Sequence, residues 1–373
     1  MSGPFYLSRN VIYILTFLGA FALAHAYMPL AFWVGRKFKL MDHPGARKIH
    51  DKPVLRCGGF TIFFSIWTMV FIGLIILQVF SVYDINVPIS RLLTVNKRFE
   101  IAFETLIGLF FCSSLIYLTG FLDDKYSPRF NLRMKWILQI VATFIVVRFF
   151  HVRTHMVPWR EVDQLLSFLW ILGLMNAFNL LDNMNGLCAG VAFICTSFLL
   201  WVSVAQSQYY IALLTLVMMG ALLGYLPYNF PKARVFLGDQ GSLVIGFLLA
   251  CLTLLESYIS AEKTDVHFEV LMPLFTMALP LFDTASVIII RLKQKRPLFV
   301  GDKSHLSHRL VDLGLSPVKA VIVLYILTAV FAINAIILVY AEAFTGIMTM
   351  LQSLMMILIL SLLMVYGKKK TEI

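Results

Sequence analysis

Two adjacent carboxylates, Asp123 and Asp124, stand at the end of a long apolar segment. Charges at membrane depth are rare and usually serve a function, so two adjacent carboxylates at the end of a span need an explanation. Paired carboxylates can hold a divalent cation through their oxygens, or one can act as a base while the other orients it. An interfacial ion pair with Lys125 or Arg129 is the alternative interpretation. The acidic pair is the first candidate for chemistry in this chain.

A second polar stretch runs from Asn176 to Gly186, between two apolar segments. Asn179, Asp182 and Gly186 are three and four residues apart, so a continuing helix would place them on one face. Their side chains could meet a metal or a sugar. The alternative is that Asp182 or Asn183 caps the following segment. Capping does not explain Asn176 and Asn179, which lie inside the preceding segment.

A third stretch, from Phe236 to Ser242, reads Phe-Leu-Gly-Asp-Gln-Gly-Ser. It places Asp239 at the start of an apolar segment, beside the free backbone N–H groups of a helix start. This combination suits a phosphate bridged by magnesium. N-capping by Asp239 itself is the alternative.

A basic segment, residues 44–59, carries Lys48, His50 and Arg56 and ends in Gly58-Gly59. Cations at this density suit phosphate groups, and the glycine pair permits close backbone approach or a sharp turn into a helix. A loop that only anchors the membrane topology is the alternative.

A second basic segment, residues 301–310, holds His305 and His308 on one helical face, with Arg309 adjacent. Two histidines without further ligands make a poor zinc site, so they fit phosphate contacts better. The cations just before this segment could equally anchor it to anionic lipid. Asp283, inside the preceding apolar segment, is expected to pair with a basic residue such as Arg291, and a place in the lining of the site is the alternative.

The elements that must position these residues are apolar helices. The 373-residue chain is 60% hydrophobic and only 14% charged, whereas soluble domains are about a quarter charged. This composition excludes a disordered chain and an ordinary water-soluble enzyme. A span needs about 20 apolar residues, which predicts an all-α polytopic membrane protein formed by one domain over residues 1–373. The eleven predicted spans are about 11–34, 59–82, 100–121, 134–150, 165–181, 187–205, 209–226, 241–259, 270–290, 318–340 and 344–366.

The charges predict an orientation for these spans. Most of the 31 lysines and arginines fall in one of the two alternating sets of loops. Such loops mark the cytoplasmic side, so we expect the N-terminus outside and the C-terminus in the cytoplasm. All the polar segments above then face the cytoplasm. The net charge of +11 is thereby explained without a nucleic-acid partner.

Taken in order, these segments resemble the polyprenyl-phosphate N-acetylhexosamine-1-phosphate transferases along nearly the whole chain. Each motif alone is weak, but five in the same order are specific. The matching motifs are Arg47-Lys48-x-His50-x-x-Pro53-x-x-Arg56-x-Gly58-Gly59, Asp123-Asp124, Asn179-x-x-Asp182, Phe236-x-Gly238-Asp239-x-Gly241-Ser242 and Asp302-x-x-His305-x-x-His308-Arg309-Leu310.

The resemblance implies a multi-pass enzyme of the plasma (inner) membrane, with ten or eleven spans and its site in cytoplasmic loops. Its reaction transfers a sugar 1-phosphate from a UDP-N-acetylhexosamine to undecaprenyl or another polyprenyl phosphate in the bilayer, and releases UMP. Mg²⁺ or Mn²⁺ is required. A homodimer is left open.

The resemblance also implies a role for individual residues. It makes Asp239, with Asn179 beside it, the metal site, and it places Phe236 against the uracil ring. The implied catalytic residues are Asp123, Asp124, Asp182, His305 and His308. The implied substrate-binding residues are Lys48, His50, Arg56, Asn185, Phe236 and Arg309.

The chain departs from the family pattern in two places, which bear on the donor sugar more than on the reaction class. The family usually has Asp-Gly-x-Asp-Gly where this chain has Asp-Asn-Met-Asn-Gly, from Asp182 to Gly186. The last motif usually reads His-x-His-His, and here Ser307 replaces the middle histidine. The motifs are most similar to those of enzymes that use UDP-N-acetylglucosamine.

Three other functions compete with this interpretation. One is a non-catalytic scaffold or receptor, but the four retained acids, Asp123, Asp124, Asp182 and Asp239, argue against a loss of activity. The branch that uses UDP-N-acetylmuramoyl-pentapeptide for peptidoglycan is the nearest rival. A multi-span transporter would also contain charges and asparagines within its spans, but it predicts acids near the bilayer midplane and repeat symmetry. Here the acids cluster at the ends of segments, and no repeat is visible.

Overall fold

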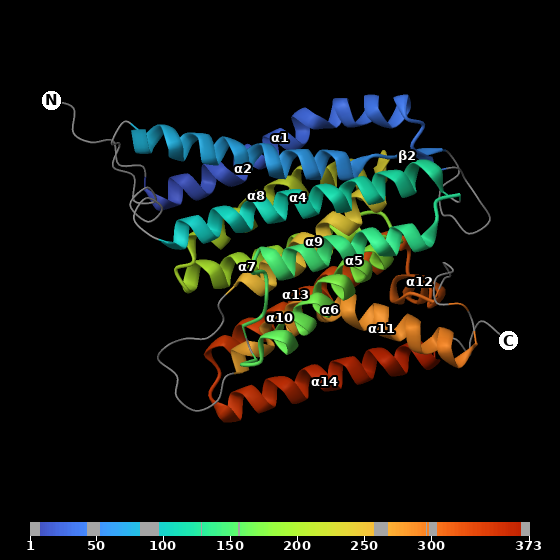
Figure 1. The fold of residues 1–373 in the computed structure, drawn as a ribbon. Helices are drawn as coiled ribbons and strands as arrows, with labels where there is room; N and C mark the ends of the chain where they lie inside the picture. Colours follow the sequence, from blue (N-terminus) through green and yellow to red (C-terminus); the bar gives the residue numbers. More distant parts are fainter. Residues whose placement is uncertain are drawn as a thin grey trace.

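The structure, a computed structural model, describes residues 8–42, 53–82, 97–127, 129–155, 157–256, 268–295, 297 and 304–366. Long helices run along one another, and a small sheet lies at one end of the bundle (Figure 1). The long helices are α1 (Arg9–Lys37), α2 (Gly58–Val82), α4 (Lys97–Tyr126), α5 (Leu132–Phe149), α6 (Arg160–Leu181), α7 (Leu187–Ala205), α8 (Tyr209–Asn229), α9 (Asp239–Leu255), α11 (Ala278–Lys293), α13 (Pro317–Tyr340) and α14 (Ala343–Tyr366).

Each of the eleven predicted apolar segments contains a helix, but fewer qualify as membrane spans. Within the described ranges, eight helices are long and apolar enough to cross a bilayer. The exceptions are α5, which carries three cations, α9, which has 17 residues, and the ninth segment. That segment is broken into a 3₁₀ turn, η1 (Phe268–Leu271), then α10 (Met272–Thr276) and α11. The eleven-span count and the orientation of the chain therefore stay predictions.

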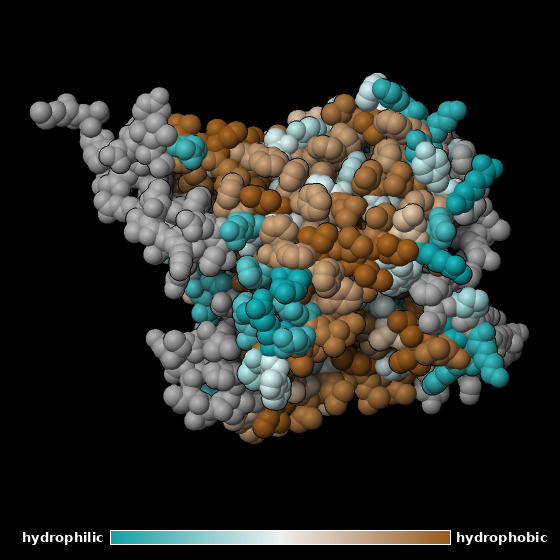
Figure 2. Space-filling model, viewed as in Figure 1, coloured by the Kyte–Doolittle hydropathy of each residue, from teal (hydrophilic) through white to brown (hydrophobic). Residues whose placement is uncertain are grey.

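The outer surface of the bundle is apolar. Figure 2 shows hydrophobic residues across the middle of the molecule and hydrophilic residues gathered toward its ends. Large side chains such as Ile75 and Leu354 are 63% and 61% exposed. A soluble monomer rarely shows so large an apolar surface. The chain is therefore a multi-pass membrane protein.

Helix α9 is the centre of the bundle. Every residue from Gln240 to Leu254 is buried, and α2, α4, α6 and α7 pack against it. At 1.5 Å per residue its 17 residues span only about 26 Å, less than the roughly 30 Å hydrocarbon core. A helix that is apolar all round is buried in a protein core or spans a membrane, and here the neighbouring helices enclose it. Its neighbours therefore hold its first residue, Asp239, in a defined place.

Gly59 allows α2 to cross the start of α9 at backbone distance. A Cβ at Gly59 would overlap the backbone of Gly241, and the Gly59 N–H donates to the carbonyl of Leu237 at 2.9 Å. The glycine pair was expected to serve a ligand or a turn. The structure shows that Gly59 serves contact between two helices.

Substituting Gly59 with alanine should therefore destabilise the protein by about 1–3 kcal/mol, the usual cost of overpacking. Gly73, on the same helix, is the matched control, because nothing lies within 4 Å of the Cβ that it lacks. Gly73→Ala should be neutral or stabilising, because alanine favours helix more than glycine does. Thermal unfolding in detergent measures both variants. Equal midpoints for the two would contradict this account of the crossing.

A short sheet joins polar segments that are far apart in sequence. Its strands are β1 (Met41–Asp42), β2 (Val54–Arg56) and β3 (Val235–Phe236). β1 pairs antiparallel with β2, and β2 pairs parallel with β3, with Arg56 beside Phe236. This pairing brings the end of the first basic segment next to the Gly-Asp motif.

Candidate active site

The described parts of the five polar segments meet at one end of the bundle, around a cavity of about 730 Å³. Its wall includes seven of the residues predicted for the site, namely Arg56, Asp124, Asp182, Asn185, Phe236, Asp239 and His308. Asp123, Asn179, His305 and Arg309 are not among the residues that line the cavity. Lys48 and His50 lie outside the described residues.

A lysine joins two of the predicted acids. The Lys135 Nζ donates to Asp123 Oδ2 at 2.7 Å and also to the carboxylate of Asp239. Lys135 stands in the first turn of α5 and was not among the predicted site residues. Its signal in the sequence was a cation at the very start of an apolar segment. The ammonium neutralises much of the charge that the two carboxylates bring together.

Asp124 caps the start of α9. Its carboxylate oxygens accept hydrogen bonds from the backbone N–H groups of Asp239 and Gln240, both at 3.1 Å. Gly238, at φ 74°, leaves room for this carboxylate, since a Cβ there would meet it. The expectation of free N–H groups at this helix start was wrong, because an acid of the same chain already occupies them. The alternative, N-capping of α9 by the Asp239 side chain, was also wrong, because the Asp124 carboxylate accepts these hydrogen bonds.

Arg56 balances the charge of Asp124. One guanidinium nitrogen lies 3.9 Å from Asp124 Oδ1, and another pairs with Asp42 of β1. The carbonyl of Arg56 also accepts from Gln240 Nε2 at 2.8 Å. The short sheet thus positions a cation on the cavity wall.

The asparagine-rich segment does not continue as a helix. Helix α6 ends at Leu181, with Asp182 as its C-cap. Asn179 Nδ2 donates to Ser242 Oγ at 2.9 Å, which ties α6 to the start of α9. Asn176 instead bonds Gln139 at 2.9 Å, so its role is structural.

Asp182 faces the cavity from the end of α6. Burial and the charge of Asp239 raise the pKa of its carboxyl to about 7, although Arg56 opposes this shift. A carboxyl that holds a proton near neutral pH can donate a hydrogen bond to a substrate oxygen.

The histidine motif forms a short helix, α12 (Leu306–Asp312). His305 Nδ1 donates to Asp283 Oδ2 at 2.8 Å, and the N–H of Leu306 donates to Asp283 Oδ1 at 2.7 Å. The structural pairing expected for Asp283 is therefore present, but the partner is His305 rather than Arg291. Arg309 Nε donates to the carbonyl of Ser304 at 2.9 Å. Of the motif residues that the structure describes, from Ser304 onward, only His308 lines the cavity.

The loop from Phe230 to Arg234 also lines the cavity and was missed from the sequence. It contributes an aromatic ring and two cations. Asn229, just before it, donates to the carbonyl of Val235 at 2.8 Å and accepts from the N–H of Gly186 at 2.6 Å. The two cations, Lys232 and Arg234, were used in the sequence analysis only to predict the orientation of the spans. Cations in a polar loop also fit phosphate binding.

The oxygen-bearing side chains around Asp239 fit a hard divalent cation. Mg²⁺ is usually bound through one or two carboxylates together with substrate phosphates. Asp239 and Asp123 supply two carboxylates that share Lys135, and Asn179 lies close to Asp239. Among the described residues, no cluster of three or more His, Cys, Asp or Glu forms a metal cage. The residues therefore fit a metal that is shared with phosphate rather than enclosed by protein.

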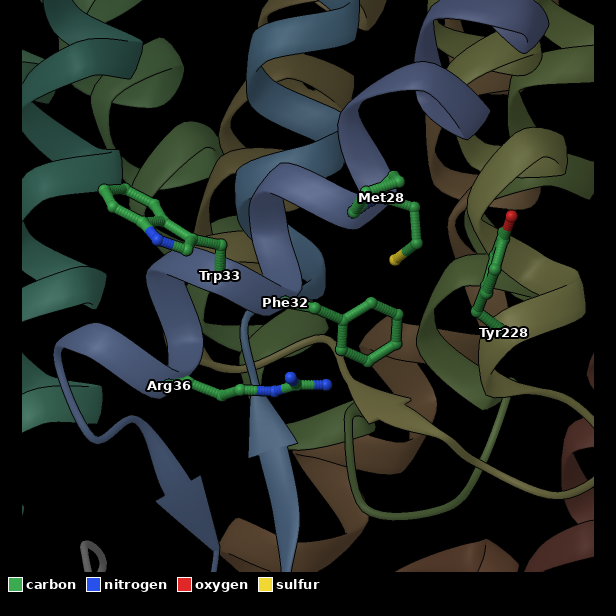
Figure 3. A pocket seen from close by; sticks show the side chains of 6 residues that line it. Met28, Phe32, Trp33, Arg36 and Tyr228 are labelled. Atoms are coloured by element: carbon green, nitrogen blue, oxygen red, sulfur yellow. The ribbon is translucent and has the colours of Figure 1, made fainter.

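A second cavity, of about 390 Å³, lies between α1 and α8. Figure 3 shows Met28, Phe32 and Tyr228 around a common space, with the Arg36 guanidinium below Phe32. Pro29, inside α1, also lines it. The wall is mostly apolar and contains none of the predicted site residues, so the candidate chemistry belongs to the larger cavity.

Comparison with known proteins gives consistent results. Residues 106–257 match the model of glycosyl transferase family 4. The probable undecaprenyl-phosphate N-acetylglucosaminyl 1-phosphate transferase of Bacillus subtilis is 32% identical over 88% of this chain and 86% of its own. The decaprenyl-phosphate N-acetylglucosaminephosphotransferase of Mycolicibacterium smegmatis is 27% identical over 80% of this chain and 75% of its own. The phospho-N-acetylmuramoyl-pentapeptide-transferase of Bacillus pumilus is 34% identical, but over only 46% of this chain and 57% of its own.

Fold and site together define an integral-membrane protein whose polar cavity, at one end of a helix bundle, suits phosphorylated substrates. The chain belongs to the polyprenyl-phosphate N-acetylhexosamine-1-phosphate transferases of glycosyl transferase family 4.

Proposed function

We propose that this protein transfers N-acetylglucosamine 1-phosphate from UDP-N-acetylglucosamine to undecaprenyl phosphate or a similar polyprenyl phosphate, and releases UMP. The observation that carries the proposal is the cavity whose wall holds Asp124 and Asp239 together with Arg56. Beside this wall, Lys135 joins the carboxylates of Asp239 and Asp123. Such a mixture can hold a diphosphate and a phosphate side by side. The relatives that cover most of the chain carry names of this activity.

In the proposed reaction, an oxygen of the lipid phosphate attacks the sugar-linked phosphorus, and the bond to UMP breaks. Bound Mg²⁺ would offset the charge that two phosphorylated substrates bring together. Asp239, Asn179 and Asp123 are the residues that would hold it. Arg56 and His308 would contact the diphosphate from the cavity wall, and Phe236 would lie against the uracil. Asp124 and His305 would act by positioning α9 and α12.

The proposal includes the orientation that the charges predict. The cavity would face the cytoplasm of a plasma membrane, where a nucleotide sugar can reach it. The lipid phosphate would arrive from the bilayer along the apolar helices.

UDP-N-acetylmuramoyl-pentapeptide is the second candidate donor. The sequence identity to a relative of the branch that uses it is slightly higher than the identity to the Bacillus subtilis relative, but the match covers only about half the length of each chain. Purified protein in detergent, with undecaprenyl phosphate and a panel of radiolabelled UDP-sugars, would distinguish the donors. The expected result is UMP release that requires both the lipid and Mg²⁺, with UDP-N-acetylglucosamine as donor. A well-folded sample that acts on none of the panel would overturn the proposal.

Asp123 is the candidate base, and its contribution should be modest. A phosphate monoester has its second pKa near 6, so the nucleophile is already largely ionised at neutral pH. We expect Asp123→Asn to lower kcat by roughly tenfold, because Asp239 and Asn179 would still hold the metal and the loss of the base would stay below the hundredfold at which general-base effects usually begin. Single-turnover kinetics should show the chemical step slowed. A loss of several thousandfold would indicate instead an obligatory base or a covalent intermediate on Asp123.

A further inference from the structure

One hydrogen bond joins the helix that carries His308 to the loop that carries Asp182. Ser307 Oγ, on α12, donates to Asn183 Oδ1 at 2.6 Å. Ser307 is only 2% exposed, and Asn183 lies on the cavity wall together with Asn185 and His308. The bond therefore sets the distance between two parts of the same wall.

The orientation of the asparagine is fixed from its other end. Asn183 Nδ2 donates to the carbonyl of Leu180 at 3.0 Å, so the amide oxygen faces Ser307. Both groups of the amide thus have partners, and the serine hydroxyl is used as a donor. A buried bond of this kind is costly to leave half made.

Other described contacts of α12 hold it against different elements. Asp283 holds the start of α12 against α11, and helix packing joins α12 to α13. Neither contact reaches the loop from Asp182 to Gly186. Among the side-chain hydrogen bonds described, the bond from Ser307 to Asn183 is the one that links α12 to this loop.

The same two positions are departures from the family pattern described above. Asn183 stands where the pattern has glycine, and Ser307 stands where it has histidine. The structure places these departures in direct contact. An imidazole at position 307 would need the space that the Asn183 side chain occupies, and a glycine at 183 would leave a serine hydroxyl without its partner.

We propose that Asn183 and Ser307 act as one positioning pair, which holds His308 against the Asp182 loop and so shapes the wall that recognises the donor nucleotide sugar. The inference rests on the proposed function. Each residue is matched to the other, so that a change at one is tolerated only with the corresponding change at the other. Neither residue takes part in bond making.

A double-mutant cycle tests the pair with Asn183→Gly, Ser307→His and the double variant. We expect each single change to raise the KM for UDP-N-acetylglucosamine about tenfold, and the double variant to recover most of that loss, as coupled neighbours do. The KM for the lipid phosphate should stay unchanged, which a general loss of folding would not produce. Ser307→Ala, which removes only the hydroxyl, serves if Ser307→His fails to fold.

The matched control is Asp312→Asn, at an exposed position on the same helix. Its combination with Asn183→Gly should be additive. If Asn183→Gly and Ser307→His have additive effects on the KM for UDP-N-acetylglucosamine in an active enzyme, the two residues do not act as a positioning pair. The proposed function would not be affected by that result. A wild-type protein that releases no UMP from any UDP-sugar would overturn the proposed function instead.

Discussion

Replacing Asp239 with asparagine is expected to lower kcat roughly 10²–10³-fold, the loss seen when one preorganised group that stabilises a transition state is removed. The side chain at this position bonds Lys135, and it lies close to Asp123 and Asn179. Asparagine keeps the volume but loses the charge that would hold a divalent cation on the diphosphate. UMP release at saturating substrate measures the effect.

This variant should remain folded. The cap on α9 depends on the backbone N–H of Asp239 and not on its side chain. Lys135 also keeps its bond to Asp123. Glu342→Gln is a suitable control, because Glu342 is exposed between α13 and α14, outside the candidate site. It should leave both turnover and the thermal midpoint unchanged. Turnover of Asp239→Asn within threefold of wild type would rule out Asp239 as the metal-holding residue.

The helices could be predicted from the sequence because each is a long local pattern. Apolar runs near 20 residues indicate a helix in a membrane without knowledge of its neighbours. The convergence of the polar segments followed from the same pattern, since alternate loops share a side. The ninth segment shows the limit of this reasoning, because its composition does not reveal the break before α11.

The contacts inside the site could not be predicted in the same way. Asp124 and the N–H groups that it caps are 115 and 116 residues apart, and Lys135 and Asp239 are 104 apart. A strand of two or three residues, such as β2 or β3, has too few positions to show a period. The acids were therefore recognised as a group, while their division into a helix cap and the proposed metal site required the fold.

Lys135 offers the second large effect, which is a change in stability. In the structure its ammonium lies between the carboxylates of Asp123 and Asp239. Lys135→Met would leave two like charges in a partly buried place, and removing one partner of such a group costs about 3–5 kcal/mol. We therefore expect a marked fall in the thermal midpoint when the variant is measured in EDTA.

Magnesium should reverse much of this loss. A cation that binds only the folded protein stabilises it by about 2.7 kcal/mol at a hundred times its Kd. In the variant, Mg²⁺ would take the place of the ammonium, whereas in the wild type it must compete with that ammonium. The rise in thermal midpoint on adding Mg²⁺ should therefore be larger for Lys135→Met than for the wild type, with Lys135→Arg resembling the wild type. If Mg²⁺ leaves the midpoint of the methionine variant unchanged, then the cluster of Asp123 and Asp239 does not hold the metal.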